Sequence, residues 1–313
     1  MVAQRMSAQG MSALARVLDS DVAYSFRRSP IAIGAALVLA VILFGAVLAP
    51  WVAPHNPLDL ASLNLMDSRV PPVWDADGQW TFPLGTDDQG RDILSGIMYG
   101  VRISLLIGIS SVLFAVVVGI TVGLLAGYAG GMLDAVLMRL ADIQLTFPAI
   151  LIALLVDGVV TAALPQEMHE QLKAQVLIFS IGISYWPQFA RTVRGSTLVE
   201  RGREYVMAAR VIGLSSARIM LTHILPNVLG PVFVIGTLTL GLAVLAEATL
   251  SFLGVGLPPS SPSVGTLIRI GNDFLFSGEW WMTIFPGLAL VLLVLSINLL
   301  GDWLRDALNP RLR

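Results

Sequence analysis

Six long apolar runs limit the possible fold of this chain more than any other feature of its sequence, because only short polar segments remain between most of them. The runs cover residues 31–52, 103–128, 135–160, 174–189, 224–253 and 280–300. Most of them reach the roughly 20 residues that an α-helix needs to cross a bilayer. The chain is 56% hydrophobic and only 13% charged, about half the charged fraction of an ordinary soluble domain. We therefore predict an all-α integral membrane protein with six transmembrane helices.

The first run has the flanking residues of a retained membrane helix. Arg27 and Arg28 precede it directly, and Trp51 lies near its end, where an aromatic side chain anchors a helix at the membrane interface. The apolar region of a cleaved signal peptide has roughly 7–15 residues, fewer than this run contains. We therefore expect an uncleaved first helix.

The second and third runs carry signals about helix packing. Gly119, Gly123 and Gly127 recur every four residues in the second run, which predicts a smooth face that another helix can approach closely. Pro148 lies inside the third run and predicts a kink at that point. We expect packing roles for these residues and no chemistry.

The distribution of basic residues predicts the orientation of the chain. If the N-terminus is inside, 14 of the 19 Lys and Arg residues fall in inner segments and 5 in outer segments. Short loops rich in Lys and Arg stay in the cytoplasm. We thus expect a cytoplasmic segment 1–28, a first helix in 29–53, an extracytoplasmic loop 54–98, a five-helix core 99–304 and a cytoplasmic tail 305–313. Residues 195–226 then form a cytoplasmic loop within the core.

The stretch 200–226 is amphipathic and basic rather than apolar, and its basic residues are Arg201, Arg203, Arg210, Arg218 and His223. Val206, Ala209 and Gly213 recur at helical spacing on a separate stripe. Gly213 suits the left-handed position that follows a helix, and Ser215 or Ser216 can cap a second short helix. The pattern predicts a helix–glycine–helix elbow. This elbow is either a docking surface for a partner or an interfacial helix pair on lipid headgroups.

The outer loop contains two short patterns. Residues 73–82 are predicted to form a β-hairpin with Asp77-Gly78 as its turn; the same turn lacks the further oxygen ligands of a calcium-binding loop. Residues 85–92 read Gly-Thr-Asp-Asp-Gln-Gly-Arg-Asp. They predict a capped turn that opens a helix, with Asp87 or Asp88 as the N-cap.

Glu247 is the one carboxylate deep inside an apolar run. An ionisable side chain is costly in hydrocarbon, so Glu247 should face the interior of the bundle or a cavity. Two interpretations are open for this residue. It lines the translocation path or a gate, or it makes a helix–helix hydrogen bond with Thr249, Ser251 or a partner subunit.

Several kinds of chemistry are absent from the sequence. A P-loop needs a Lys after a glycine-rich turn, but Lys173 is the one Lys and follows Glu-Gln-Leu. We therefore predict that the chain does not hydrolyse ATP, and that uphill transport would draw on a partner or an ion gradient. The chain has no Cys, so it has no disulfide or thiol chemistry. We predict no metal site, and the net charge of −2 argues against nucleic-acid binding.

Motifs over almost the whole chain resemble those of ABC importer permeases. Ala208-Ala209, Gly213 and Leu225-Pro226 resemble the "EAA" loop, with Met207 where the family has Glu and with His223 where it has Ile. Residues 85–92 resemble the GTDxxGRD signature of C-type permeases from dipeptide and oligopeptide importers. Further matches are LAGYAGG at 125–131, Phe-Pro at 147–148, AEATLSFLG at 246–254, NLLGD at 298–302 and NPRLR at 309–313.

The resemblance implies a fold and a docking site. The fold is that of type I ABC importers, with six transmembrane helices and a cytoplasmic coupling helix in the elbow. An ATP-binding subunit would dock on Glu204, Tyr205, Met207, Ala208, Ala209, Arg210, Gly213, Leu214 and Ser215. Glu204, one helical turn from Met207, is a candidate for the carboxylate that the family has at position 207.

The resemblance also implies partners and a location. A homologous B-type permease would complete the pathway, two ATP-binding subunits would hold ATP and Mg, and a substrate-binding protein would dock outside, while this chain itself binds no cofactor. The expected location is the bacterial inner membrane, with both termini in the cytoplasm. The expected cargo is a di- or oligopeptide, and close relatives carry nickel or glutathione. The alternatives from other classes are an ion-gradient-driven secondary transporter and a membrane scaffold without transport.

Overall fold

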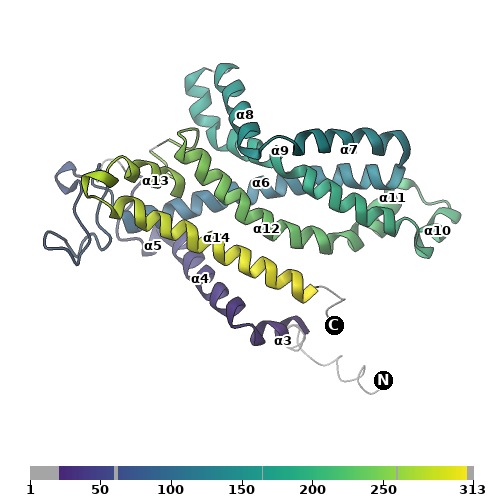
Figure 1. Cartoon of the computed structure of the whole chain (residues 1–313), viewed down its shortest axis with the longest axis horizontal. Coiled ribbons are helices and arrows are strands. Elements are labelled where there is room, and N and C mark those ends of the chain that lie inside the picture. Colours follow the sequence, from purple (N-terminus) through teal and green to yellow (C-terminus); the bar gives the residue numbers. More distant parts are fainter. Residues whose placement is uncertain (1–20, 60–62, 164, 259, 309–313) are drawn as a thin grey trace.

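The computed structural model describes residues 21–59, 63–163, 165–258 and 260–308, whose arrangement is shown in Figure 1. Within these ranges every regular element is helical, apart from an isolated bridge between Thr86 and Asp92. The elements are α3 (Asp21–Arg28), α4 (Pro30–Val47), α5 (Ala49–Val52), η3 (Leu65–Asp67), α6 (Ile93–Ala129), α7 (Gly131–Leu145), α8 (Ala149–Ala163), α9 (Gln166–Glu200), α10 (Glu204–Val211), α11 (Ser216–Ile219), η4 (Met220–Ile224), α12 (Leu225–Phe252), α13 (Val264–Asn272), η5 (Leu275–Ser277) and α14 (Trp281–Leu308). The all-α prediction is confirmed.

Among the residues that the structure describes, four helices are long and apolar enough to cross a membrane. They are α4, α6, α12 with its lead-in from Ser216, and α14. The pair α7 and α8 makes a fifth span if it crosses as one unit. The predicted run 174–189 lies within α9, which has 35 residues and is not among the spans found by length and hydropathy. The structure thus supports four or five spans by these criteria, and the predicted count of six is not exactly confirmed.

The glycines of α6 allow α9 to lie directly against it. A Cβ on Gly119 would be 2.3 Å from Phe189 Cβ, and one on Gly123 would be 2.6 Å from the carbonyl oxygen of Ala190. Gly127 is equally crowded. Real Cβ atoms essentially never come so close to their neighbours, so this separation of α6 and α9 requires glycine at these positions. The predicted close approach is confirmed.

The third predicted run is broken rather than kinked. We expected one helix over 135–160, but α7 ends at Leu145 and α8 starts at Ala149, with an angle of 92° between them. Pro148 lacks a backbone N–H and disfavours helical backbone at the residue before it, Phe147. In Figure 1, α8 and the start of α9 stand beside each other and point away from the long axis of the bundle.

Two helix limits differ from the prediction. α6 starts at Ile93 instead of residue 103, because the Asp92 side chain caps it by accepting a hydrogen bond from the Ser95 backbone N–H at 2.9 Å. α9 begins at Gln166, eight residues before the predicted apolar run 174–189, so the polar residues ahead of that run are also helical. α8 and α9 pack against each other.

The predicted hairpin over 73–82 is wrong. Two consecutive turns replace it: the Asp75 N–H donates to the Pro72 carbonyl at 2.9 Å, and the Gly78 N–H donates to the Asp75 carbonyl at 3.1 Å. Gly78 lies so close to Pro72 that a Cβ would be 2.1 Å from the proline carbonyl oxygen. Asp77-Gly78 therefore does not form the turn of a two-stranded hairpin.

A short helix at the outer loop's end of the bundle, α13, was not predicted. Ser263 caps it by accepting a hydrogen bond from the Thr266 N–H at 3.3 Å. Gly265 lies against the backbone of Ala248 in α12, and Gly271 lies against that of Met282 in α14. Two glycines of α13 therefore let it pack closely against the backbones of α12 and α14. Figure 1 shows α13 and the outer loop at one end, while α10, α11, α3 and the end of α14 lie toward the other.

Candidate functional site

The elbow formed by α10, Gly213 and α11 is the candidate site at the end of the bundle opposite the outer loop (Figure 1). It connects α9, which ends at Glu200, to η4 and α12. Three residues, 201–203, separate α9 from α10. Because this connection is so short, a displacement of the elbow must be transmitted to the end of α9.

Backbone hydrogen bonds fix the bend of the elbow. Gly213 has a φ of 81°, its N–H donates to the Arg210 carbonyl at 3.0 Å, and the Leu214 N–H donates to the Ala209 carbonyl at 3.1 Å. This pair of bonds is a Schellman motif, which favours glycine at the left-handed residue. Ser215, not Ser216, caps α11 by accepting a hydrogen bond from the Arg218 N–H at 3.4 Å. The predicted helix–glycine–helix geometry is confirmed.

The elbow has a buried face and an exposed face. Val206 and Ala209 are buried against the bundle, and Leu214 packs on the same core. The exposed residues are Glu204, Tyr205, Met207, Ala208, Arg210, Gly213 and Ser215. Ala209, which we expected in the docking surface, is only 3% exposed and packs into the hydrophobic core beneath the elbow. The docking role of the exposed residues stays a prediction.

Two exposed apolar residues of the elbow lie outside the predicted docking set. Val211 is 87% exposed and Ile212 is 74% exposed. They end α10 at the outermost part of the bend. The sequence showed that this apolar pair directly precedes Gly213, and the structure adds that both side chains are exposed.

The elbow is fastened to the end of α6. Arg201 Nη1 donates to the Gly127 carbonyl at 2.9 Å, which satisfies one of the carbonyls that a helix end leaves free. The Arg210 guanidinium carbon lies 5.0 Å from the centre of the Tyr128 ring, within cation–π range. A hollow of about 630 Å³ lies beside this pair and is lined by Tyr128, Arg210, Leu214, Ser216 and Met220 among others.

A second set of bonds joins the elbow to α9 and α12. The Tyr205 hydroxyl donates to Glu200 and accepts from Asn227 Nδ2 at 3.0 Å. Burial, and then the hydrogen bond to Glu200, raise the pKa of Tyr205 above its usual value of 10.0. Tyr205 therefore keeps its proton at neutral pH and remains a donor. These contacts make α10 one unit with the ends of both neighbouring helices.

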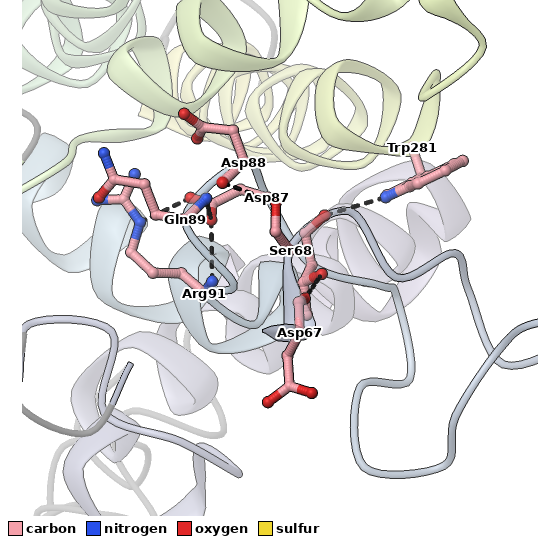
Figure 2. A network of polar contacts seen from close by, with 8 residues as sticks. Asp67, Ser68, Asp87, Asp88, Gln89, Arg91 and Trp281 are labelled. Carbon is pink, nitrogen blue, oxygen red and sulfur yellow. Dashed lines mark hydrogen bonds and ion pairs between the residues drawn. The ribbon is translucent and has the colours of Figure 1, made fainter. Parts of the chain in front are cut away.

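The GTDDQGRD segment forms a rigid turn at the other end (Figure 2). Asp87 Oδ1 accepts hydrogen bonds from the backbone N–H groups of Gln89 and Arg91, both at 2.9 Å, and Oδ2 pairs with Arg91 Nε at 2.6 Å. Asp87 is therefore not the N-cap of α6, and neither is Asp88, because Asp92 caps the helix. Burial, and then the charge of Asp87, raise the pKa of Asp88.

Neighbouring segments hold this turn in place. Trp281 Nε1 in α14 donates to the Thr86 carbonyl at 3.1 Å, as Figure 2 shows. Thr86 Oγ1 donates to the Asp67 carbonyl and accepts from the Val70 N–H. The signature therefore locks the outer loop to the start of α6 and of α14, and its position favours a structural role.

Glu247 lies in the interior of the bundle. Its side chain is fully buried, and Oε1 accepts a hydrogen bond from Ser251 Oγ at 2.7 Å. Ser263 Oγ of the α13 cap donates to Ser251 Oγ at 3.1 Å, so the carboxylate is linked to α13. Thr249 bonds to the Leu245 carbonyl instead. The expected hydrogen bond with Ser251 is present, but it lies within α12 rather than between two helices. The role of Glu247 in a translocation path stays a prediction.

Comparison with known proteins identifies the family. A family model described as "Binding-protein-dependent transport system inner membrane component" matches residues 119–313, which include the elbow. The chain belongs to this family of transport permeases. A second model, "N-terminal TM domain of oligopeptide transport permease C", matches residues 20–72. The chain is thus a multi-pass inner-membrane permease subunit, and membership of the family implies ATP-binding subunits and a partner permease.

Individual relatives cover nearly the whole permease. The "Di/tripeptide transport system permease protein DppC" of Pseudomonas aeruginosa is 39% identical over 92% of this chain and 91% of that protein. The "Dipeptide transport system permease protein DppC" of Escherichia coli is 40% identical over 92% and 91%. Inward-facing structures of the MetNI methionine ABC transporter match 67% of this chain and 94% of theirs, with 21% identity and a TM-score of 0.51. That likeness confirms the permease fold.

Proposed function

We propose that this chain is the C-type permease subunit of an ABC importer for di- or oligopeptides. The substrate class is supported by the names of relatives that match about nine-tenths of both chains. The observation that carries the proposal is the elbow. It is a bent, exposed helix pair joined directly to α9 and α12, in a chain whose family transports with the help of binding proteins.

The exposed face of the elbow suits an ATP-binding subunit. Met207, Val211 and Ile212 offer apolar area, Ala208 permits close approach, and Glu204 supplies a carboxylate in the first turn of α10. The arginine excess of the inner segments supports a cytoplasmic position for this end. ATP and Mg would be held by the two ATP-binding subunits, with this chain contributing the surface that they move.

The proposed mechanism follows from the short connections of the elbow. Closure of the ATP-binding subunits on ATP would displace α10 and α11. α9 and α12 would move with them, because Tyr205 bonds to Glu200 of α9 and to Asn227 of α12. The pathway would lie between this chain and a homologous B-type permease, with Glu247 near it at the outer half of α12. A substrate-binding protein would deliver the peptide from outside.

Reconstitution of the complex in lipid vesicles tests this function. With the B-type permease, both ATP-binding subunits and the binding protein, we expect uptake of a labelled dipeptide that requires ATP. Ala208→Arg should abolish copurification of the ATP-binding subunits and uptake. The matched control Ala76→Arg places the same side chain on an exposed alanine of the outer loop and should leave copurification intact. Uptake driven by a proton or sodium gradient without ATP would refute the proposal.

Labelling of single cysteines tests the orientation. Because the chain has no cysteine, Val211→Cys and Trp80→Cys each create a unique thiol at sites that are 87% and 86% exposed. A membrane-impermeant maleimide added to intact spheroplasts should label position 80 and leave position 211 unlabelled. Inverted membrane vesicles should give the reverse. Labelling of position 211 from outside would place the elbow on the wrong side for an ATP-binding partner.

A further inference from the structure

Pro187 leaves a gap in the hydrogen bonding of α9. Proline has no backbone N–H, so the carbonyl four residues earlier, that of Ile183, loses its helical partner. Gln144 of α7 fills the gap, because its Nε2 donates to the Ile183 carbonyl. The other side-chain atom of Gln144, Oε1, accepts a hydrogen bond from Trp186 Nε1 at 2.7 Å. The side-chain amide of Gln144 thus both donates to and accepts from groups in the proline turn of α9.

Gln144 occupies a special place in α7. It is the second-last residue of that helix, immediately before the 92° break that leads to α8. The same turn of α9 also contacts the far side of the break, since Ser184 Oγ lies 3.3 Å from the carbonyl oxygen of Ala149, the first residue of α8. The break between α7 and α8 is therefore attached to α9 on both sides.

A second attachment lies near the elbow. Asp134, in the first turn of α7, forms a two-fold hydrogen bond with Arg194 of α9, at 2.5 and 2.7 Å. Bidentate pairs of this kind fix orientation as well as distance. Asp134 and Gln144 are ten residues apart, about 15 Å along a helix. Two separated fastenings keep α7 aligned with the part of α9 that ends at the elbow.

We propose that Gln144 is a positioning residue for transport: it couples movement of α9 to the α7–α8 break. The proposal rests on the proposed function, in which the elbow displaces α9. Without Gln144, the end of α7 would lose its two hydrogen bonds to the proline turn, and a shift of α9 would leave the α7–α8 break behind. With Gln144 in place, the turn is closed, and a shift of α9 carries the end of α7 and the start of α8 along. The test is therefore a direct measurement of coupling between ATP hydrolysis and transport.

The measurement is the ratio of dipeptide taken up to ATP hydrolysed in reconstituted vesicles. Gln144→Leu removes both hydrogen bonds, and we expect this ratio to fall about fivefold or more, the lower range of ordinary allosteric coupling, while ATP hydrolysis continues. Trp186→Phe removes one bond and should lower the ratio less. Gln188→Leu is the matched control: it is the same substitution one residue after Pro187, at a side chain for which the described residues give no hydrogen bond, and it should leave the ratio unchanged.

A double variant separates coupling from stability. Gln144→Leu/Pro187→Ala gives the Ile183 carbonyl a backbone partner again, so the thermal midpoint of the complex should recover, but α7 stays unfastened and the ratio should stay low. An unchanged ratio in Gln144→Leu, an equal fall in Gln188→Leu, or full recovery of the ratio in the double variant would each overturn the inference. Failure of the proposed function looks different, because the wild-type complex would then show no ATP-driven uptake.

Discussion

The contact between α6 and α9 gives a direct test of how the bundle is packed. A Cβ on Gly123 would lie 2.6 Å from the carbonyl oxygen of Ala190 and 2.7 Å from Val193 Cβ. Ordinary contact begins at 3.4 Å, so Gly123→Ala must move α9 by about 0.8 Å, the difference between 3.4 and 2.6 Å. The obstacle is a backbone carbonyl inside a helix, which cannot rotate away as a flexible side chain can.

The cost of that movement follows from a comparison with a second glycine. Gly195 lies inside α9, and a Cβ there has nothing within 4 Å. Gly-to-Ala changes inside helices favour the helix by about 1 kcal/mol, and this gain is common to both variants. The difference in unfolding free energy between Gly123→Ala and Gly195→Ala therefore isolates overpacking, which costs about 1–3 kcal/mol.

Unfolding by sodium dodecyl sulfate in mild detergent measures this difference. Tryptophan fluorescence is a suitable signal, because the backbone of Trp186 lies against Gly119 in the same interface. We expect Gly123→Ala to unfold at a lower dodecyl sulfate fraction than Gly195→Ala, by about 1–3 kcal/mol of unfolding free energy. Equal midpoints for the two variants would show that α6 and α9 have room for a side chain, and the close packing would be refuted.

Three further predictions concern the elbow and the outer turn. Gly213→Ala puts a Cβ at a φ of 81°, so it should destabilise the elbow by about 1–2 kcal/mol, seen as faster proteolysis there. Asp87→Ala removes the buried carboxylate that pairs with Arg91 and accepts two backbone N–H bonds, and it should cost about 3–5 kcal/mol of unfolding free energy, whereas exposed Asp77→Ala should cost little. Burial raises the pKa of Asp88 above 3.8, so the stability contributed by the protonated Asp88 is present below that pH and lost as the pH rises through the raised pKa. The thermal midpoint of Asp88→Asn should therefore exceed that of the wild type by a margin that grows from pH 3 to pH 7. A constant difference between the two midpoints would contradict this.

The elbow was predictable because its signals are local. Gly213 and Ser215 act on residues within a few positions of themselves, through a left-handed φ and a helix cap. The orientation of Ala209 was not predictable in the same way. Helical spacing showed that Val206 and Ala209 share a stripe, but which stripe faces the bundle depends on the arrangement of α6 and α12 around the elbow.

In the outer loop, by contrast, contacts between distant residues decided the structure more than local signals did. From the sequence we expected Asp87 or Asp88 as the N-cap of the helix, although Asp92 is equally suitable by residue type. Arg91 and the turn around it engage Asp87, so Asp92 is left to cap α6. The predicted hairpin failed for a related reason: strands need a partner surface, and the outer loop forms turns packed against the helix ends instead.

By itself, the sequence determined that the protein lies in a membrane, that its fold is helical, which family it belongs to and where the elbow bends. These follow from composition, from motifs and from interactions within one or two helical turns. The tertiary structure alone decided that Ala209 points inward, that α7 and α8 meet at 92°, and that Gln144 completes the proline turn of α9. Each of these depends on groups that are far apart along the chain, so no local pattern encodes their contact.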